Sequence, residues 1–458
     1  MTAEKRVIVF NHFAVPRDQP GGTRHVELFS RLPGWNYTII ASHRNLSTGE
    51  TQAHAPGFVF VPVTRYRANG MSRVLNWISY AITATFAALA KPRPDVVYAS
   101  SPHLLAALAG WLVAKVRRAR FVLEIRDLWP QVLVDMGHLQ ESSLLYRLLH
   151  ELEKFLYRQA ECIVVMAPGS KTALEQMGVA PSKITYIPNG ADPEDFVPSA
   201  DRETLRGKYG FTKLTAVYAG AHGPANGLSL LLDAADEIRE LPIDIVLVGD
   251  GVLKNELMDT ARMRDLRNVR FLAPIPKSEI PDLLAAADVG LHVLADVDLF
   301  RTSVSPNKVF DYMAAGLFVV TNCPGAVTEL VETSGAGIGV GPTDLVEGLR
   351  FACKLDTAEL TAAGDHGRAW LEREQSRTAM ATRLEGILTS ERPLQPHMSA
   401  LPSSTMLDKS GKTSAEAGPR RSTGTQNDLA PPIRSCPELT PDGRKRCVTD
   451  NRPSGNAG

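Results

Sequence analysis

The chain of 458 residues contains 50 lysines and arginines and 50 aspartates and glutamates, so its formal net charge is zero. This balance differs from the basic composition of nucleic-acid-binding proteins, and we expect no nucleic-acid partner. Hydrophobic residues make up 44% and charged residues 22%, as in soluble globular enzymes. The five cysteines are scattered, which excludes a disulfide framework and a C-x-x-C metal pair. The start MTAEKRVIVF has no signal-peptide pattern and predicts a cytoplasmic location.

Short runs rich in valine and isoleucine alternate with amphipathic segments along most of the chain. The first series predicts the strands RVIVF, NYTIIA, FVFVPV, DVVYAS, RFVLEI, ECIVVM and KITYIP. The second series predicts LTAVYAG, IDIVLVGD, NVRFLAP, DVGLHVL, LFVVTN and AGIGVG. Apolar runs without polar alternation are typical of strands covered on both faces, and their alternation with helices indicates parallel sheets. The predicted fold class is therefore α/β, with two doubly wound, Rossmann-like domains.

The segment IPNGADPEDFVPSAD connects the two series, and its prolines indicate a linker. Within it, Asn189, Gly190 and Asp192 are predicted to fix the interdomain turn. From about residue 392 the chain has no Phe, Tyr or Trp and is rich in Pro, Ser, Thr, Gly and Arg, which predicts disorder. The predicted units are an N-terminal domain at 1–190, a linker at 191–212, a C-terminal domain at 213–368, a C-terminal helix at 369–391 and a disordered tail at 392–458.

Two apolar segments in the first half raise the question of a membrane. The runs RVLNWISYAITATFAALAKPR and LLAALAGWLVAKVRRAR are too diluted or too short to predict a membrane span. We interpret both as core helices of an α/β layer. The alternative is that one face also rests on a membrane surface, where Arg117, Arg118 and Arg120 would be attracted to anionic lipid.

Glycine-containing loops follow three strands of the second series and open helices. They are YAGAHGPANGL with Gly220, Gly223 and Gly227, LVGDGVLK with Gly249, Gly251 and Lys254, and SVSPNKVFDYMAAG. Glycine lets the backbone approach a ligand closely, and three such loops at one sheet edge favour a phosphate site. None of them matches G-x-G-x-x-G or G-x-x-x-x-G-K-[ST], so dinucleotide oxidoreductase and P-loop chemistry do not fit.

The third of these loops predicts a helix N-terminus that faces a ligand. Ser305 is a good N-cap, Pro306 suits the first helical position and Gly316 is a C-terminal stop. The free N–H groups of the helix start and the charge of Lys308 suit a phosphate. Asp311 lies one turn inside the predicted helix. It would either face a bound ligand or be an acidic side chain that faces solvent.

Polar residues also follow strands in the first half, where ligands bind in open α/β sheets. RDLWP places Arg126 and Asp127 after one strand, although a buried Arg–Asp salt bridge is the alternative. SPH places His103 after another strand, where a helix-start role competes with a catalytic one.

The motifs PGGTRHVELFSRL, RDLWP, IPNGAD, YAGAHGPANGL, VGDG, NVRFLAPIPKSEIPDLLAAADVGL and SPNKVFDYMAAG occur in this order. In that order the chain resembles family-4 glycosyltransferases, the retaining class with the GT-B fold. It is most similar to transferases of the fucosamine-transferase type in bacterial cell-surface polysaccharide synthesis. The resemblance extends from about residue 5 to 390. It implies that the C-terminal helix returns to brace the first domain.

The resemblance implies roles for the third loop of the second half. Ser305, Asn307 and Lys308 would face the diphosphate of a nucleotide-sugar, and Asp311 would bind the ribose hydroxyls. Many relatives carry two glutamates eight positions apart here, and this chain has Ser303 at the position of the first and Asp311 at that of the second.

The glycine loop that opens the second domain also departs from the family pattern. Pro224 replaces a basic phosphate-binding residue that many relatives carry. We expect His222, Asn226 and backbone N–H groups to take over part of its work, with Lys254 supplying charge.

In the first domain, many relatives have His-Asp where this chain has Arg126 and Asp127. We expect Asp127, Arg126 and His103 to form the catalytic set, with Asp127 positioning the sugar or activating the acceptor. Gly21 and Gly22 would let the first loop approach the donor or the acceptor. Arg24 and His25 would project from the helix start, and we expect Gly21, Gly22 and Arg24 to bind the acceptor.

The resemblance implies retaining transfer of an N-acetylated amino or deoxy sugar from a nucleotide-diphosphate donor, and uridine is the base that we expect. The acceptor would be a saccharide or a polyprenyl-diphosphate-linked glycan, with possible contact to a membrane surface. No cofactor and no metal are expected, because family members generally work without a divalent ion. Two alternatives stay open: a nucleotide-sugar 2-epimerase of the same fold, and a non-catalytic nucleotide-sugar-binding subunit.

Overall fold

The computed structural model describes residues 4–46, 48–66, 70–135, 137, 139–297, 305 and 307–390. The predicted tail at 392–458 and the candidate residue Ser303 lie outside the described residues.

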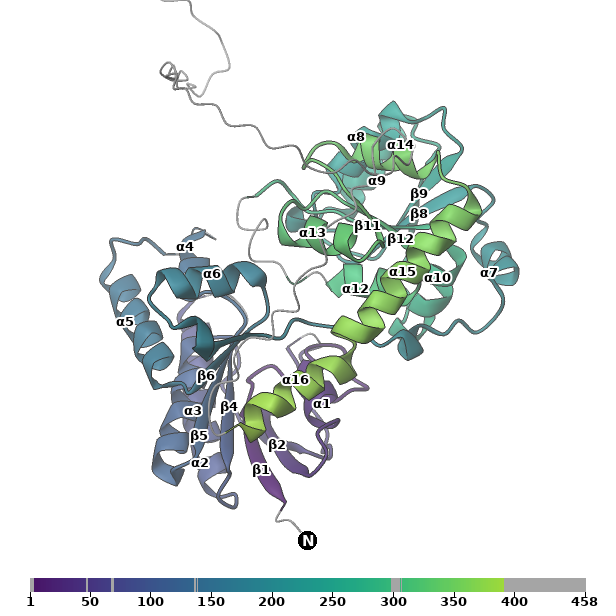
Figure 1. Cartoon of the computed structure of the whole chain (residues 1–458). Coiled ribbons are helices and arrows are strands. Elements are labelled where there is room, and N and C mark those ends of the chain that lie inside the picture. The colour runs from purple at the N-terminus through teal and green to yellow at the C-terminus, as the bar shows by residue number, and fades with distance from the viewer. Residues whose placement is uncertain are drawn as a thin grey trace, which may run out of the picture. The chain divides into compact units, whose positions relative to one another are not determined.

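The N-terminal domain is built on a parallel sheet with the strand order β3-β2-β1-β4-β5-β6-β7 (Figure 1). Its strands are β1 Lys5–Phe10, β2 Trp35–Ser42, β3 Phe58–Val61, β4 Val96–Ser101, β5 Arg120–Ile125, β6 Cys162–Val165 and β7 Ile184–Tyr186. Each runs through a segment that the sequence predicts as a strand. The chain reverses direction across the sheet between β1 and β4, the kind of point at which open α/β sheets bind ligands.

Helices cover both faces of this sheet. They are α1 Arg24–Phe29, α2 Met71–Leu89, α3 Leu104–Arg117, α4 Gln131–Asp135, α5 Leu144–Gln159 and α6 Pro168–Gln176. Alternate side chains of β1 point to opposite faces: Ile8 and Phe10 pack with α2 and α3, whereas Val7 and Val9 pack with α1. Among the described residues, no helix is long and apolar enough to cross a membrane.

The C-terminal domain repeats this plan with the strand order β10-β9-β8-β11-β12-β13. Its strands are β8 Leu214–Ala219, β9 Ile243–Val248, β10 Val269–Leu272, β11 Val289–His292, β12 Phe318–Thr321 and β13 Gly337–Gly339. The helices are α7 Arg202–Tyr209, α8 Ser229–Glu237, α9 Lys254–Met263, α10 Ile280–Ala286, α12 Asn307–Ala314, α13 Ala326–Thr333 and α14 Leu345–Ala352. The order reverses between β8 and β11, so the loops after these two strands lie together.

The C-terminal helix differs from its prediction at 369–391. The structure has two helices there, α15 Thr357–Gln375 and α16 Arg377–Thr389. The break occurs because the Ser376 side chain accepts a hydrogen bond from the Ala379 N–H and starts a new helix. Helix α16 lies beside α1 (Figure 1) and buries Met380 and Leu384 in the core that α1 also packs against.

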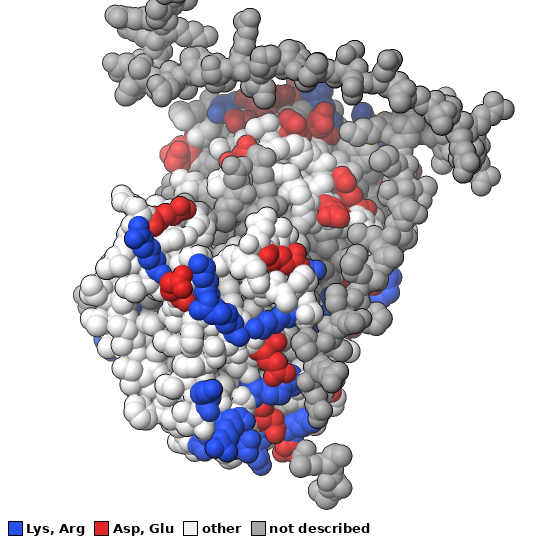
Figure 2. Space-filling view, turned by 60° about the vertical axis from the view of Figure 1, so that its left-hand side comes forward, with Lys and Arg blue, Asp and Glu red and all other residues white. Residues whose placement is uncertain are grey.

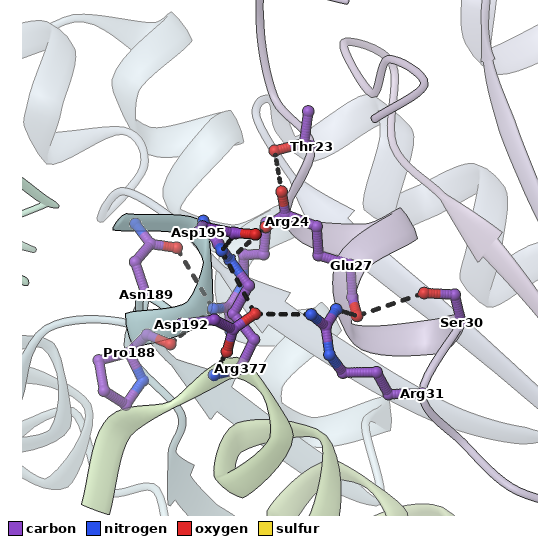
Figure 3. A network of polar contacts seen from close by, with 10 residues as sticks. All are labelled: Thr23, Arg24, Glu27, Ser30, Arg31, Pro188, Asn189, Asp192, Asp195 and Arg377. Carbon is purple, nitrogen blue, oxygen red and sulfur yellow. Dashed lines mark hydrogen bonds and ion pairs between the residues drawn. The ribbon is translucent and has the colours of Figure 1, made fainter. Parts of the chain in front are cut away.

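An ionic network holds the start of α16 (Figure 3). Arg377 lies 2.5 Å from a carboxylate oxygen of Glu27, 3.4 Å from Asp192 and 2.6 Å from Asp195. Arg31 of the region after α1 also pairs with Asp192 at 2.6 Å. The predicted turn residue Asp192 therefore joins α1, the linker and α16.

Candidate functional site

The start of α12 is fixed against the ends of two neighbouring strands in the C-terminal domain. The Tyr312 hydroxyl of α12 accepts a hydrogen bond of 3.1 Å from the Ala219 N–H at the end of β8. The Tyr312 ring crosses β11 at Gly290, where a Cβ would collide with it. This close approach places the helix N-terminus beside the loop that follows β8. Helix α12 begins at Asn307, and the predicted N1 residue Pro306 lies outside the described residues.

The two glycine loops interlock and present their backbone at the same edge. The Gly220 N–H donates to the Val248 carbonyl at 2.9 Å, and the His222 N–H donates to the Asp250 carbonyl at 2.8 Å. A Cβ at Gly249 would overlap the Gly220 carbonyl, so a side chain there would separate the loops. The predicted gathering of glycine loops is therefore a packing requirement as well as a candidate ligand surface.

Lys308 lies over the first glycine loop. Its aliphatic stem packs on the Cα of Gly220, and its Nζ lies 5.2 Å from the ring centroid of Tyr218. Burial lowers the pKa of Lys308, and the nearby Asp311 carboxylate opposes that shift. Within the part of the chain that the structure describes, the ammonium makes no ion pair and no hydrogen bond. A half-buried cation without an anion is costly, and a phosphate at this position would supply one.

Asp311 lies one turn further along α12, in a half-buried position. Burial raises its pKa to about 6, against the attraction of Arg377, Lys277 and Lys308, while Glu27 raises it further. Near neutral pH the carboxylate is ionised without a hydrogen bond to any described residue. It is therefore available to accept hydrogen bonds from two neighbouring hydroxyl groups, as a ribose presents them.

The other residues predicted to bind the nucleotide-sugar donor differ in exposure. His222 is fully buried between Tyr218 and Phe271, and burial lowers its pKa. Neither of its ring nitrogens has a hydrogen-bond partner among the described residues, and its contact with phosphate stays a prediction. Lys254 donates to the carbonyls of Gly249 at 2.6 Å and of Leu272 at 2.9 Å, which leaves one N–H for a ligand.

Four further residues predicted to bind the nucleotide-sugar donor lie in loops or at the start of α12. Gly223 and Asn226 are half-buried in the first loop, and Asn307 is exposed at the start of α12. The Ser305 hydroxyl is buried and has no hydrogen-bond partner in residues 307–390 or elsewhere in the described chain.

The prediction that Arg24 and His25 project from the helix start is wrong. Arg24 is buried and donates to Glu124 at 2.9 Å and to the carbonyls of Pro188 and Ile187 at 2.6 and 2.7 Å. The His25 ring is fully buried, 3.0 Å from the other oxygen of Glu124. The buried carboxylate of Glu124 in β5 pairs with both side chains, and the neighbouring cations hold the pKa of Glu124 well below its usual range.

His103 caps α3 and is enclosed in an aromatic cluster. Its Nδ1 accepts a hydrogen bond from the Ala106 N–H at 3.2 Å, so Nε2 carries the proton and donates to His12 Nδ1 at 2.9 Å. Burial lowers the pKa of both imidazoles. Because both ring nitrogens of His103 are engaged within the protein, the structure supports the helix-start interpretation of this residue.

Arg126 and Asp127 follow β5 as predicted, but no salt bridge joins them in the described structure. A guanidinium nitrogen of Arg126 lies 4.0 Å from the position of a Cβ at Gly22, so the RDLWP segment and the first loop meet. Asp127 is exposed, and partial dehydration still raises its pKa while Arg126 opposes the shift. An accessible carboxylate beside a cation and a glycine loop fits the predicted contact with a sugar.

A cavity of ≈ 250 Å³ opens at the carboxyl ends of β1, β2 and β3. Its lining residues include His12, Phe13, Arg44, Arg65 and Asn76. Sequence reasoning missed this site, although His12 lies only two residues after the first predicted strand and could have pointed to it. Within the described ranges, no three His, Cys, Asp or Glu residues cluster in a way that could hold a metal ion.

Two family models match the two domains. The glycosyl transferase 4-like domain matches residues 15–190, and glycosyl transferases group 1 matches residues 213–355. The chain is a glycosyltransferase with the GT-B fold. This part of the predicted resemblance is confirmed.

Curated relatives extend over most of the glycosyltransferase. It is 25% identical to the probable glycosyltransferase WbjE of Pseudomonas aeruginosa over 68% of this chain and 78% of that protein. It is 27% identical to the putative colanic acid biosynthesis glycosyl transferase WcaI of Escherichia coli K12, over 66% and 77% of the two chains.

Solved structures confirm the predicted fold of the glycosyltransferase. Sucrose-phosphate synthase from Thermosynechococcus elongatus superposes with a TM-score of 0.65 at 16% identity, covering 84% of this chain and 98% of that one. The HepE protein of Anabaena, in complex with UDP and glucose, gives 0.61 at 18% identity, with coverages of 84% and 100%.

Proposed function

We propose that this glycosyltransferase moves a sugar from a nucleoside-diphosphate donor to a saccharide or lipid-linked acceptor in bacterial cell-surface polysaccharide synthesis, with retention of the anomeric configuration. The donor carries an N-acetylated amino or deoxy sugar on uridine diphosphate. The printed names of the relatives support this class: colanic acid biosynthesis for WcaI, and transfer from UDP-Gal to a diphosphoundecaprenol-linked sugar for an E. coli enzyme that is 32% identical over 123 residues.

The ammonium of Lys308, which has no ion-pair partner among the described residues, carries the proposal. It lies half-buried at the N-terminus of α12 and against Gly220, so a diphosphate there would meet a full charge, the free N–H groups of a helix start and a side-chain-free backbone. Asp311, one turn along, binds the ribose hydroxyls. This arrangement stabilises the negative charge that develops on the leaving nucleoside diphosphate as the glycosidic bond breaks.

Retention follows from front-face departure of the leaving group. In this mechanism a phosphate oxygen of the departing diphosphate accepts the proton of the acceptor hydroxyl, and the new bond forms on the same face of the sugar. No protein nucleophile is required. The exposed carboxylate of Asp127, beside Arg126, positions the sugar or the acceptor hydroxyl.

The cavity in the N-terminal domain suits the acceptor. Arg44 and Arg65 supply positive charge, and Asn76 supplies an amide oxygen that no described residue hydrogen-bonds, as recognition of a saccharide or a diphosphate requires.

Thermal unfolding with a panel of nucleoside diphosphates tests the donor site. We expect UDP to raise the melting temperature of the wild type, because a ligand that binds only the folded state stabilises it. Lys308→Met should lose this response, whereas Lys354→Met, an exposed lysine of the same domain, should keep it. A response that is the same in wild type and Lys308→Met would overturn the donor-site assignment, and so would the absence of any response in the wild type.

A further inference from the structure

Large hydrophobic side chains are exposed mainly on one part of the N-terminal domain. Of the seventeen that the described residues expose, eleven belong to α2, α3 and α5. These eleven form the apolar face and are Met71, Val74, Leu75, Ile78, Ile82, Phe86, Leu112, Val116, Leu144, Leu145 and Leu148. Helix α3 packs against both α2 and α5, so the three helices are neighbours. Exposed apolar residues concentrated in this way mark an interaction surface.

Helix α2 contributes most of the apolar face and is apolar on two sides. Asn76, Tyr80, Ala84 and Ala88 follow each other at intervals of one turn and pack inward. The six exposed side chains follow the opposite side, from Met71, which is 74% exposed, to Phe86, which is 70% exposed. Over fifteen residues this row extends about 22 Å along the helix. A helix that only covered the sheet would carry polar residues on this outer side.

The charges around α2 and α3 are almost all basic, whereas α5 carries both signs, with Arg147 and Lys154 beside Glu151. Residues 62–120 contain nine lysines and arginines and one acidic residue, although the whole chain is neutral. At the C-terminal ends of α2 and α3, the described structure has no carboxylate paired with Arg93, Lys115 or Arg118. Figure 2 shows a broad area without charged side chains on this domain and a group of Lys and Arg side chains at its lower end.

We propose that the apolar face docks the enzyme on an anionic lipid bilayer. Exposed aliphatic and aromatic side chains enter the boundary between headgroups and acyl chains, and the basic residues at the helix ends contact anionic headgroups. A protein partner would need a matching apolar surface with an acidic rim, whereas a bilayer supplies both properties over its whole area. A second copy of this chain would place the same basic residues against each other, which is unfavourable.

Docking in this orientation has a consequence for the acceptor. The cavity in the N-terminal domain is lined by Asn76 of α2, while the adjacent Leu75 belongs to the apolar face and is 52% exposed. Lipid contact along α2 therefore brings the cavity to the membrane surface. An acceptor with a polar head and a hydrocarbon anchor would reach it without leaving the bilayer.

Co-sedimentation with vesicles tests the proposal without any turnover. We expect the full chain to bind vesicles of phosphatidylcholine with about one third phosphatidylglycerol, and much less to bind phosphatidylcholine alone. Lys115→Gln and Arg118→Gln should each weaken binding about fivefold, since one basic residue near an anionic surface contributes about that factor. The double variant Leu75→Ser, Phe86→Ser should weaken binding to both vesicle types.

Control variants use hydrophobic side chains of the C-terminal domain that are even more exposed than Leu75 and Phe86. Val252→Ser and Met263→Ser remove hydrophobic residues that are 84% and 80% exposed, and neither should change vesicle binding. Equal binding of wild type and Leu75→Ser, Phe86→Ser would overturn the proposal, and so would a lack of vesicle binding by the folded wild type. A dimer in sedimentation that Leu75→Ser, Phe86→Ser abolishes would also overturn it, because a second copy would then cover the face. Since nucleotide binding is measured separately, failure here leaves the donor site unaffected.

Discussion

Substitution of Gly220 by alanine should weaken nucleotide binding through Lys308. A Cβ at Gly220 would lie 2.3 Å from the Cε of Lys308, and ordinary carbon contacts are about 3.5–4.0 Å. The lysine stem must therefore move by about 1.2 Å or more. Since the side chain is flexible and reaches solvent, the fold accommodates this shift, but the ammonium leaves the position where it would meet the diphosphate.

The expected loss is that of one hydrogen bond to a charged group. Such bonds contribute about 1.5–3 kcal/mol, so the affinity for UDP should fall about 10- to 150-fold. The φ of 158° at Gly220 is also unfavourable for alanine and should lower the stability of the variant by about 1–3 kcal/mol. Affinity must therefore be compared at a temperature where both proteins are folded.

Titration calorimetry with UDP measures the effect, and Gly223→Ala is the matched control. Gly223 lies in the same loop with a φ of −115°, and a Cβ there would approach only Asn226 Nδ2, at 3.8 Å. We expect Gly223→Ala to bind UDP within about twofold of wild type, well inside 1 kcal/mol. Equal affinities of folded Gly220→Ala and wild type would show that displacing Lys308 does not affect UDP binding. An equal loss in both variants would show that the effect is not specific to Lys308.

Two further predictions concern buried charge. Because burial raises the pKa of Asp311 to about 6, the folded state binds its proton more tightly than the unfolded state, and stability decreases as pH rises from about 4 to 6. Asp311→Asn should remove this decrease and raise the free energy of unfolding at pH 7 by at most about 3 kcal/mol, while weakening UDP binding. Urea denaturation at pH 4.5 and pH 7 measures the change in the free energy of unfolding. A variant less stable than wild type at pH 7 would contradict the prediction. Arg24→Ala should lower the free energy of unfolding by about 3–5 kcal/mol, because it leaves Glu124 buried without its main cation. A urea midpoint unchanged from wild type would show that this ion pair contributes little.

The strands and their parallel arrangement could be predicted because short runs rich in valine and isoleucine alternate with amphipathic segments, which is typical of parallel sheets covered on both faces. The donor loops follow as well, since the residues after β8, β9 and β11 must meet at one sheet edge. The inward turn of Arg24 was not predicted, because arginine at a helix start is usually exposed. The signal was Glu124, an acid within the apolar strand RFVLEI, which requires a buried partner.

Other features depend on tertiary packing that a single segment does not reveal. The pairing of His12 with His103 joins residues 91 positions apart, across the change of direction between β1 and β4. The break at Ser376 depends on a serine that could equally continue one helix. The exposed apolar face was predicted only as an alternative, because an apolar helix has the same sequence pattern whether one of its sides or both are covered.

The proposed donor site depends on contact between Lys308 and the diphosphate of the donor. A ³¹P NMR titration can detect this contact, because the β-phosphorus of UDP reports the charge beside it. We expect the β-phosphorus resonance to move on binding to the wild type, and to stay close to its free position when Lys308→Met is saturated with UDP. The same displacement in both proteins would contradict the claim and place the diphosphate elsewhere.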